Sequence, residues 1–288
     1  MTIKTLLVPL TGTDADRGAL ATAIAAARPF GAHVDGLFVR VDPRDAVPLL
    51  GEGMSGAMVD EIMRAAEAES SAAAARARQI FEQAAADAGV PLVTAPGQRQ
   101  GMSARWCEVT GREDEVVSHE GRLRDLLVFS HVAMDRDSPA YVTVETALLG
   151  AARPLLLSPA KMPTSIGTTV VVAWNGGLES TRAVVGALPF LRHAETVHIL
   201  TAETAVTEAS TAERLAEYLA WQDIPARIAT IKPGAEAVGA ALLARAGDLG
   251  ADLVVMGGYG HSRMREMILG GVTRYVFSHA GLPVLMAH

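Results

Sequence analysis

The stretch that decides the fold is residues 251–260, ADLVVMGGYG. Its first six residues are almost entirely apolar, which is typical of a parallel strand buried on both faces. Glycines follow at once, and glycines just past a strand end allow the backbone to approach a ligand closely, because no Cβ stands in the way. A second pair, Gly270 and Gly271, precedes a run that can begin a helix, whose unpaired N–H groups suit an anion such as phosphate. Residues 256–273 are therefore predicted to carry the function.

Outward from this stretch, the two halves of the chain repeat the same strands in the same order. The parallel segments are 7–12 with 171–176, 124–129 with 251–256, and 153–157 with 282–286. Each half alternates strands and helices as β-α-β-α-β-α-β-α-β, which favours a parallel sheet with helices on both faces. The sequence predicts an α/β protein of two tandem doubly wound parallel-sheet domains, residues 1–160 and 166–288.

The first half departs from the second in its middle section. Residues 58–88 are rich in Ala, Glu, Arg and Gln and predict a long amphipathic helix that covers the sheet, with partner binding as the alternative. A short strand is expected over residues 92–95. Residues 102–110 match no single pattern, although Trp106 is expected to pack over the helix layer.

The composition excludes several classes of protein. The net charge of −7 argues against nonspecific nucleic-acid binding, since there is no excess of Lys and Arg to neutralise phosphates. The single cysteine, Cys107, allows no internal disulfide and has no partner nearby in the sequence that would make it a nucleophile. No apolar run reaches about 18 residues, so no membrane span is predicted. We expect a soluble cytoplasmic protein.

The glycine spacing resembles a known nucleotide loop. Gly257, two residues, Gly260, nine residues and Gly270 match the G-2x-G-9x-G-(Ser/Thr) loop of the universal stress protein family, with Gly271 in place of the hydroxyl residue. In that family the loop holds the ribose and phosphates of ATP, so the resemblance implies an adenine nucleotide here, ATP or AMP, with or without Mg²⁺. The resemblance covers nearly the whole chain, as a tandem universal stress protein. In that family the last strands of two domains pair, so the resemblance implies that residues 155–157 and 284–286 pair within this chain and form an internal pseudo-dimer that covers both edges.

The resemblance places the site in the second half. An Asp that follows the first strand touches the adenine in the family, and Asn175 stands at that place in the second half, whereas Thr11 stands there in the first. The segment 130–138 of the first half is short of glycine, so that half is expected to be degenerate for nucleotide. The residues assigned to the site are Asn175, Met256, Gly257, Gly260, His261, Gly270, Gly271, Val272 and Thr273.

Three functions follow from these features. The first is a nucleotide-binding stress-response regulator with no catalytic residues, no metal ligands in the protein, and at most weak ATP hydrolysis. The alternative is a nucleotide-free tandem scaffold that acts through protein or apolar-ligand contacts. A third is an ATP-dependent enzyme, because residues 175–180, NGGLES, look similar to the SGGxDS phosphate loop of ATP pyrophosphatases. Further association into a homodimer is left open by the sequence.

Overall fold

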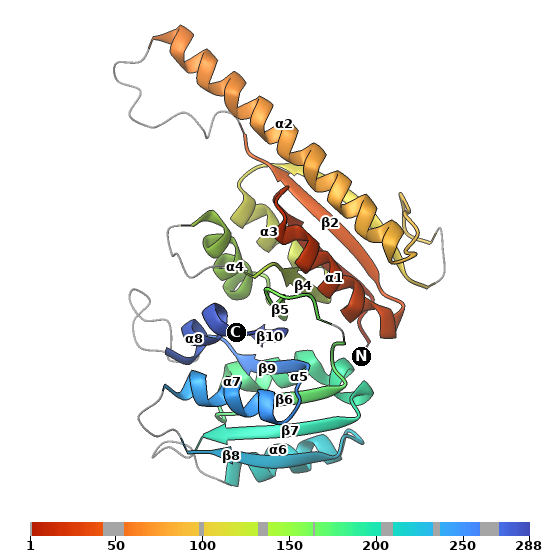
Figure 1. Ribbon diagram of the computed structural model, residues 1–288, viewed down its shortest axis with the longest axis vertical. Coiled ribbons are helices and arrows are strands. Elements are labelled where there is room, and N and C mark those ends of the chain that lie inside the picture. The colour runs from red at the N-terminus through yellow and green to blue at the C-terminus, as the bar shows by residue number, and fades with distance from the viewer. Residues whose placement is uncertain are drawn as a thin grey trace.

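The computed structural model describes residues 2–42, 55–97, 101–131, 138–163, 165–202, 210–232, 237–259 and 271–288 (Figure 1). Within these residues, ten strands form one sheet in the order β3-β2-β1-β4-β5-β10-β9-β6-β7-β8. The strands are β1 (Thr5–Leu10), β2 (His33–Arg40), β3 (Ser103–Thr110), β4 (Leu126–Phe129), β5 (Leu155–Leu157), β6 (Thr169–Ala173), β7 (Thr196–Ala202), β8 (Ala226–Ile231), β9 (Leu253–Gly257) and β10 (Val284–Ala287).

The sheet consists of two copies of one topology joined at their last strands. Read from its outer edge inward, each half places its own third strand first, followed by its second, first, fourth and fifth. Neighbouring strands within each half run parallel. At the centre β5 and β10 run antiparallel, with Leu156 opposite Leu285. The expected pair of doubly wound α/β units and the expected pairing of their last strands are therefore confirmed.

Helices cover both faces of the sheet. They are α1 (Ala15–Ala27), α2 (Gly56–Asp87), α3 (Glu113–Gly121), α4 (Pro139–Gly150), α5 (Leu178–His193), α6 (Ser210–Ala220), α7 (Val238–Asp248) and α8 (Gly271–His279), with one turn of 3-10 helix at Arg28–Phe30. Buried residues of α1, α2, α5 and α6 share one apolar layer, and those of α3, α4, α7 and α8 share the other. Among the described helices, none combines the length and apolar character needed to cross a bilayer.

The expected strand over residues 92–95 is wrong. Only Leu92 forms a bridge there, to Ala104, whereas Ser103–Thr110 pairs along the whole length of β2. Pro91 has no N–H to donate and Gly97 turns the chain with a φ of 79°, so the short segment cannot sustain a ladder. Residues 102–110 supply the strand instead.

Trp106 of β3 packs as expected against the helix layer. Its ring centroid lies 5.9 Å from that of Phe81 in α2 and 6.3 Å from that of Phe38 in β2. Aromatic contacts at these distances stabilise beyond the area they bury. They tie the outermost strand of the first half to its covering helix.

The first strand-to-helix turn has the same geometry in both halves. Gly12 has a φ of 78° and Gly176 a φ of 76°, a left-handed conformation that glycine adopts without the penalty of a Cβ. At Gly12 a Cβ would also stand 2.5 Å from the carbonyl oxygen of Ala73 in α2. Each half therefore leaves its first strand by the same turn, which is the structural counterpart of the sequence repeat.

Helix α2 is only partly a cover for the sheet. It begins after Ser55, whose hydroxyl accepts a hydrogen bond from the amide of Met58, a typical N-cap. All of its buried residues lie at Ala74 or beyond. Figure 1 shows the N-terminal turns of α2 extending past the end of β2. The amphipathic-cover interpretation therefore holds for the C-terminal part of this helix.

The two halves also contact one another through side chains beyond the central strands. The hydroxyls of Tyr141 in α4 and Tyr259, which follows β9, lie 3.1 Å apart. On the opposite face of the sheet, the rings of Phe30 and Phe190 meet edge to face at 5.3 Å. Both apolar layers contain residues from each half. The internal pseudo-dimer is thus held by a continuous core as well as by strand pairing.

Shortening one side chain at the central seam should weaken the whole molecule. Leu285 is fully buried between β9 and β5. Leu285→Ala is expected to lower the free energy of unfolding by about 2–5 kcal/mol, because it removes buried methyl groups and leaves a cavity. Guanidinium unfolding followed by circular dichroism measures the change. The control is Leu178→Ala, at a mostly exposed leucine. An equal effect of the two substitutions would contradict a shared core.

Candidate functional site

A pocket of about 190 Å³ lies at the carboxyl ends of the strands of the second half. Ligands in doubly wound sheets bind at this edge, where the strand order reverses. Here the reversal falls between β6 and β9, and both strands end at the pocket. Most of the wall is apolar, formed by Trp174, Leu200, Ile231, Val238, Leu242 and Met256. Polar atoms come from the turn after β6 and from the start of α8.

The structure brings together all the predicted site residues that it describes. All of them line this pocket: Asn175, Met256, Gly257, Gly271, Val272 and Thr273. Gly260, His261 and Gly270, which were also assigned to the site, lie outside the described residues. The pocket thus joins the turn after β6 to a segment nearly a hundred residues further along the chain.

The glycines that flank the predicted loop have different structural roles. A Cβ on Gly257 would stand 2.5 Å from the amide nitrogen of Ser180, so this glycine allows β9 to pack against the first turn of α5. A Cβ on Gly258 would stand 2.9 Å from the side chain of Leu148 in the first half. A Cβ on Gly271 would meet nothing within 4 Å. The expectation that glycine makes room for a ligand therefore fits Gly271, whereas at Gly257 and Gly258 the room is taken by the protein.

The turn after β6 is closed by its own hydrogen bonds. The side-chain oxygen of Asn175 accepts a hydrogen bond of 3.0 Å from the amide of Gly177. The hydroxyls of Ser180 and Thr181 donate to the carbonyl of Gly177 at 2.8 and 3.0 Å. This leaves the amide NH₂ of Asn175 as a donor at the rim of the pocket. Two polar groups that resemble the pyrophosphatase loop, the side-chain oxygen of Asn175 and the hydroxyl of Ser180, therefore have partners within the turn.

Sequence reasoning missed Trp174. The indole N–H of this residue is buried and has no hydrogen-bond partner among the described residues. Trp174 lines the site pocket and also a second pocket of about 370 Å³ between α5 and α6. Its place directly before Asn175, at the end of a predicted strand, was the signal that could have identified it. Glu179, the carboxylate in the pocket wall, was missed as well.

The corresponding edge of the first half is filled by a carboxylate of the protein. Asp16 is buried and accepts hydrogen bonds from the amide and hydroxyl of Thr11 at 3.1 Å and from the amide of Gly12 at 2.7 Å. Burial raises the pKa of Asp16, against the effect of these bonds. Burial and the charges of Asp114 and Asp16 raise the pKa of Glu113 nearby to about 7. These amides therefore face a protein anion rather than a free edge.

A second polar cluster, missed by sequence reasoning, lies at the opposite edge of the first half. It joins residues near the starts of β2, β3 and β4 around Asp35. Cys107 touches this cluster, with its sulfur 3.7 Å from Asp35. Burial, followed by the charge of Asp35, raises the pKa of the Cys107 thiol to about 11. The thiol is therefore protonated at neutral pH, which disfavours a nucleophilic role.

Comparisons with known proteins agree with this architecture. Residues 168–288 match the sequence model of the Universal stress protein family. A universal stress protein from Archaeoglobus fulgidus is similar in structure, with 17% identity, 99% of this chain and 96% of that chain covered, and a TM-score of 0.66. A functionally unknown protein from Pseudomonas aeruginosa has 14% identity, coverage of 98% and 92%, and a TM-score of 0.54. No curated protein matches the sequence.

Proposed function

We propose that this chain is a universal stress protein, since its residues 168–288 match the sequence model of that family, and that its C-terminal half binds an adenine nucleotide, ATP or AMP. The protein then works as a nucleotide-binding regulator of the stress response and not as an enzyme. One observation carries the proposal: the turn at Asn175 and the start of α8 meet in one pocket at the switch point of the sheet. We also propose that residues 1–160 and residues 166–288 form its two domains.

The apolar end of the pocket suits the base. Trp174, Leu200 and Met256 offer flat or branched apolar surface of the kind that surrounds a bound heterocycle. The free NH₂ of Asn175 stands at the rim, where it can donate to a ring nitrogen. The buried indole N–H of Trp174, which has no partner among the described residues, is a second donor beside the base.

The start of α8 suits the phosphates. Gly271 is the first residue of this nine-residue helix, so its exposed amides and the helix dipole favour an anion there. Val272 and Thr273 follow in the wall. We assign Gly260, His261 and Gly270 to the same end from the loop spacing. With ATP as the ligand, Mg²⁺ would be held by the phosphates and the carboxylate of Glu179, which are oxygen donors that this ion prefers.

We propose one nucleotide for each chain. In the first half Asp16 already accepts the turn amides, and Glu113 stands close by. Both groups would repel a phosphate. The first half then stabilises the molecule through the shared core and does not bind a second nucleotide.

Calorimetry of the full chain with ATP, ADP and AMP, each with and without Mg²⁺, tests the proposal. We expect a Kd of roughly micromolar order for at least one of them, with one site for each chain. Gly271→Val should weaken binding by about tenfold or more, because the new side chain enters space that the ligand needs. No described atom lies within 4 Å of a Cβ at this position, so the variant without ligand should be as stable as the unaltered protein.

The matched control is Gly281→Val, just beyond the other end of α8, where a Cβ also meets nothing within 4 Å. It should bind nucleotide as the unaltered protein does. Absence of heat with every nucleotide, or equal binding by both variants, would overturn the proposal. The apolar walls would then favour the alternative of a nucleotide-free scaffold with protein or apolar-ligand contacts.

A further inference from the structure

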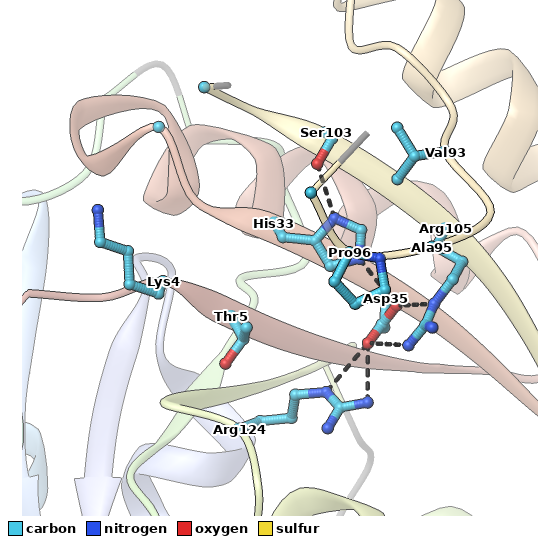
Figure 2. A pocket seen from close by; sticks show the side chains of 13 residues that line it. Lys4, Thr5, His33, Asp35, Val93, Ala95, Pro96, Ser103, Arg105 and Arg124 are labelled. Carbon is cyan, nitrogen blue, oxygen red and sulfur yellow. Dashed lines mark hydrogen bonds and ion pairs between the residues drawn. The ribbon is translucent and has the colours of Figure 1, made fainter. Parts of the chain in front are cut away.

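A larger pocket lies at the amino-terminal edge of the first half, away from the proposed nucleotide site. It has a volume of about 420 Å³, within the range of small-molecule sites. Its described walls come from the starts of β1, β2 and β3, from residues 93–97 and from Gly101. Figure 2 shows Arg105, Asp35 and Arg124 gathered on one side of it, with Lys4 on the other.

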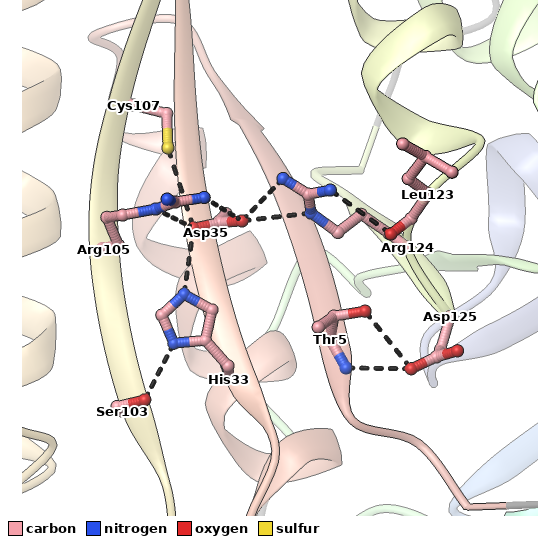
Figure 3. A network of polar contacts seen from close by, with 9 residues as sticks. All are labelled: Thr5, His33, Asp35, Ser103, Arg105, Cys107, Leu123, Arg124 and Asp125. Carbon is pink, nitrogen blue, oxygen red and sulfur yellow. Dashed lines mark hydrogen bonds and ion pairs between the residues drawn. The ribbon is translucent and has the colours of Figure 1, made fainter. Parts of the chain in front are cut away.

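Asp35 holds the polar side of this pocket together. Its side chain is only 2% exposed. Its carboxylate accepts hydrogen bonds of 2.8 and 3.1 Å from Arg105 and of 3.0 Å from Arg124 (Figure 3). One of its oxygens also lies 3.0 Å from the Nε2 of His33. Burial alone would raise the pKa of this carboxyl, but the hydrogen bonds and charges of His33 and Arg105 hold the pKa well below its usual range. Asp35 is therefore ionised and fixes the direction of both guanidinium groups.

The pocket keeps an excess of positive charge. Lys4, Arg105 and Arg124 line it, and among the described residues of its lining Asp35 alone is acidic. Asp125 lies next to it, but its carboxylate accepts from the backbone amides of Lys4 and Thr5. Even with Asp125 counted, the cations outnumber the carboxylates. In a chain with a net charge of −7, such a local excess attracts small anions.

Donors remain available after these internal bonds. A guanidinium has more N–H groups than a single carboxylate can accept, and here two guanidiniums share Asp35. Arg105 is 31% exposed, so it is reached from the pocket, and Arg124 is 14% exposed. The pair formed by His33 Nδ1 and the hydroxyl of Ser103, 2.8 Å apart, lines the same wall.

We propose that this pocket is a binding site for a small organic anion that carries a carboxylate or phosphate group. Arg105 and Arg124 donate to the anionic group, because charge-assisted hydrogen bonds from Arg suit both chemistries. Asp35 is a positioning residue, since it orients the two guanidiniums without touching the ligand. Lys4 stabilises the anion from the far side. The proposal is independent of the nucleotide site, which lies in the other half and at the opposite edge of its strands.

Calorimetry and amide NMR of the full chain, with succinate and inorganic phosphate as separate probes at constant ionic strength, test the proposal. We expect a Kd of about 1 mM or tighter for at least one probe. The amide signals of Thr5, Gly31 and Ser103, which line the pocket, should shift during the titration. Binding of phosphate alone or of succinate alone would assign the chemistry of the anion.

Charge-removing variants then locate the site. Arg105→Gln should weaken binding by roughly tenfold, and Lys4→Gln by about threefold. Lys4→Gln also protects the test against misfolding, because Lys4 is exposed and its backbone amide is unchanged by the substitution. The control is Arg78→Gln, which removes the same charge from a surface ion pair of α2. Gly271→Val should leave binding unchanged, which separates this site from the nucleotide site.

Two results would overturn the proposal. One is the absence of binding by both probes up to about 10 mM. The other is binding that Arg105→Gln and Lys4→Gln leave at the level of the unaltered protein and of Arg78→Gln. In either case the cluster around Asp35 would be purely structural.

Discussion

Asp35→Asn should lower the free energy of unfolding by about 2–4 kcal/mol at neutral pH. The side chain is 2% exposed and accepts from two arginines and a histidine, so the substitution leaves two guanidiniums facing an uncharged group. Removing one partner of a buried ion pair is more costly than removing both, because the remaining charge stays desolvated. Urea unfolding followed by tryptophan fluorescence measures the loss.

The effect should depend on pH in a known direction. The pKa of Asp35 is lower in the folded protein than its ordinary value of 3.8. The stabilisation of the folded protein by ionised Asp35 is therefore complete above pH 3.8, and it is lost as the pH falls from 3.8 toward the folded pKa. The difference between the unaltered protein and Asp35→Asn should shrink between about pH 5 and about pH 2. Asp14→Asn, at a carboxylate that is 98% exposed and pairs with Arg17, is the control and should change little at any pH. A pH-independent difference would contradict the assignment.

Gly257→Ala should destabilise the protein by about 1–3 kcal/mol or more, even with no ligand added. The new Cβ would stand 2.5 Å from the amide nitrogen of Ser180 and 2.7 Å from the carbonyl carbon of Glu179. Both atoms belong to the backbone at the start of α5, so the clash is not relieved by a side-chain rotation. Thermal and chemical unfolding of the variant measure the loss.

The comparison with Gly271→Ala makes this prediction specific. A Cβ at Gly271 meets nothing within 4 Å, so that variant should unfold like the unaltered protein. Equal stability of the two variants would show that β9 does not pack against α5 as described. The difference between the two variants also separates two causes of lost nucleotide binding. Loss of nucleotide binding in Gly257→Ala would report on the packing of the strand, whereas loss in a Gly271 variant would report on the ligand.

Much of the fold was predictable because its signals are local. Apolar runs such as 251–256 are long enough to mark buried strands, and the repetition of three such runs predicts two halves of one topology. The pairing of β5 with β10 was implied by the family resemblance, and it also covers two apolar edges that would be costly to leave unpaired. The missed element was β3. Arg105 and Cys107 face Asp35 and Trp106 faces α2, so each face of this strand mixes polar and apolar residues and the sequence shows no alternation of the two kinds.

Only part of the candidate site could be predicted from the sequence. Asn175 and Met256 each follow or end a recognisable strand, and parallel strands end at a common edge, so their meeting in one pocket was foreseeable. The separate roles of Gly257 and Gly271 were not foreseeable. Both positions hold glycine in the same motif, and only the atoms that an added Cβ would meet distinguish them.

The sequence by itself determined the alternation of strands and helices, the tandem repeat and the edge at which the strand-end turns meet, because each depends on residues close together in the chain. The tertiary structure decided what lies around Asp35. Asp35 and His33 belong to β2, Arg105 to β3, and Arg124 precedes β4, 89 positions after Asp35 in the chain. Their pattern in the sequence is that of ordinary scattered charges. They form a cluster only because β3, β2, β1 and β4 lie side by side, so that residues near their starts face a common pocket.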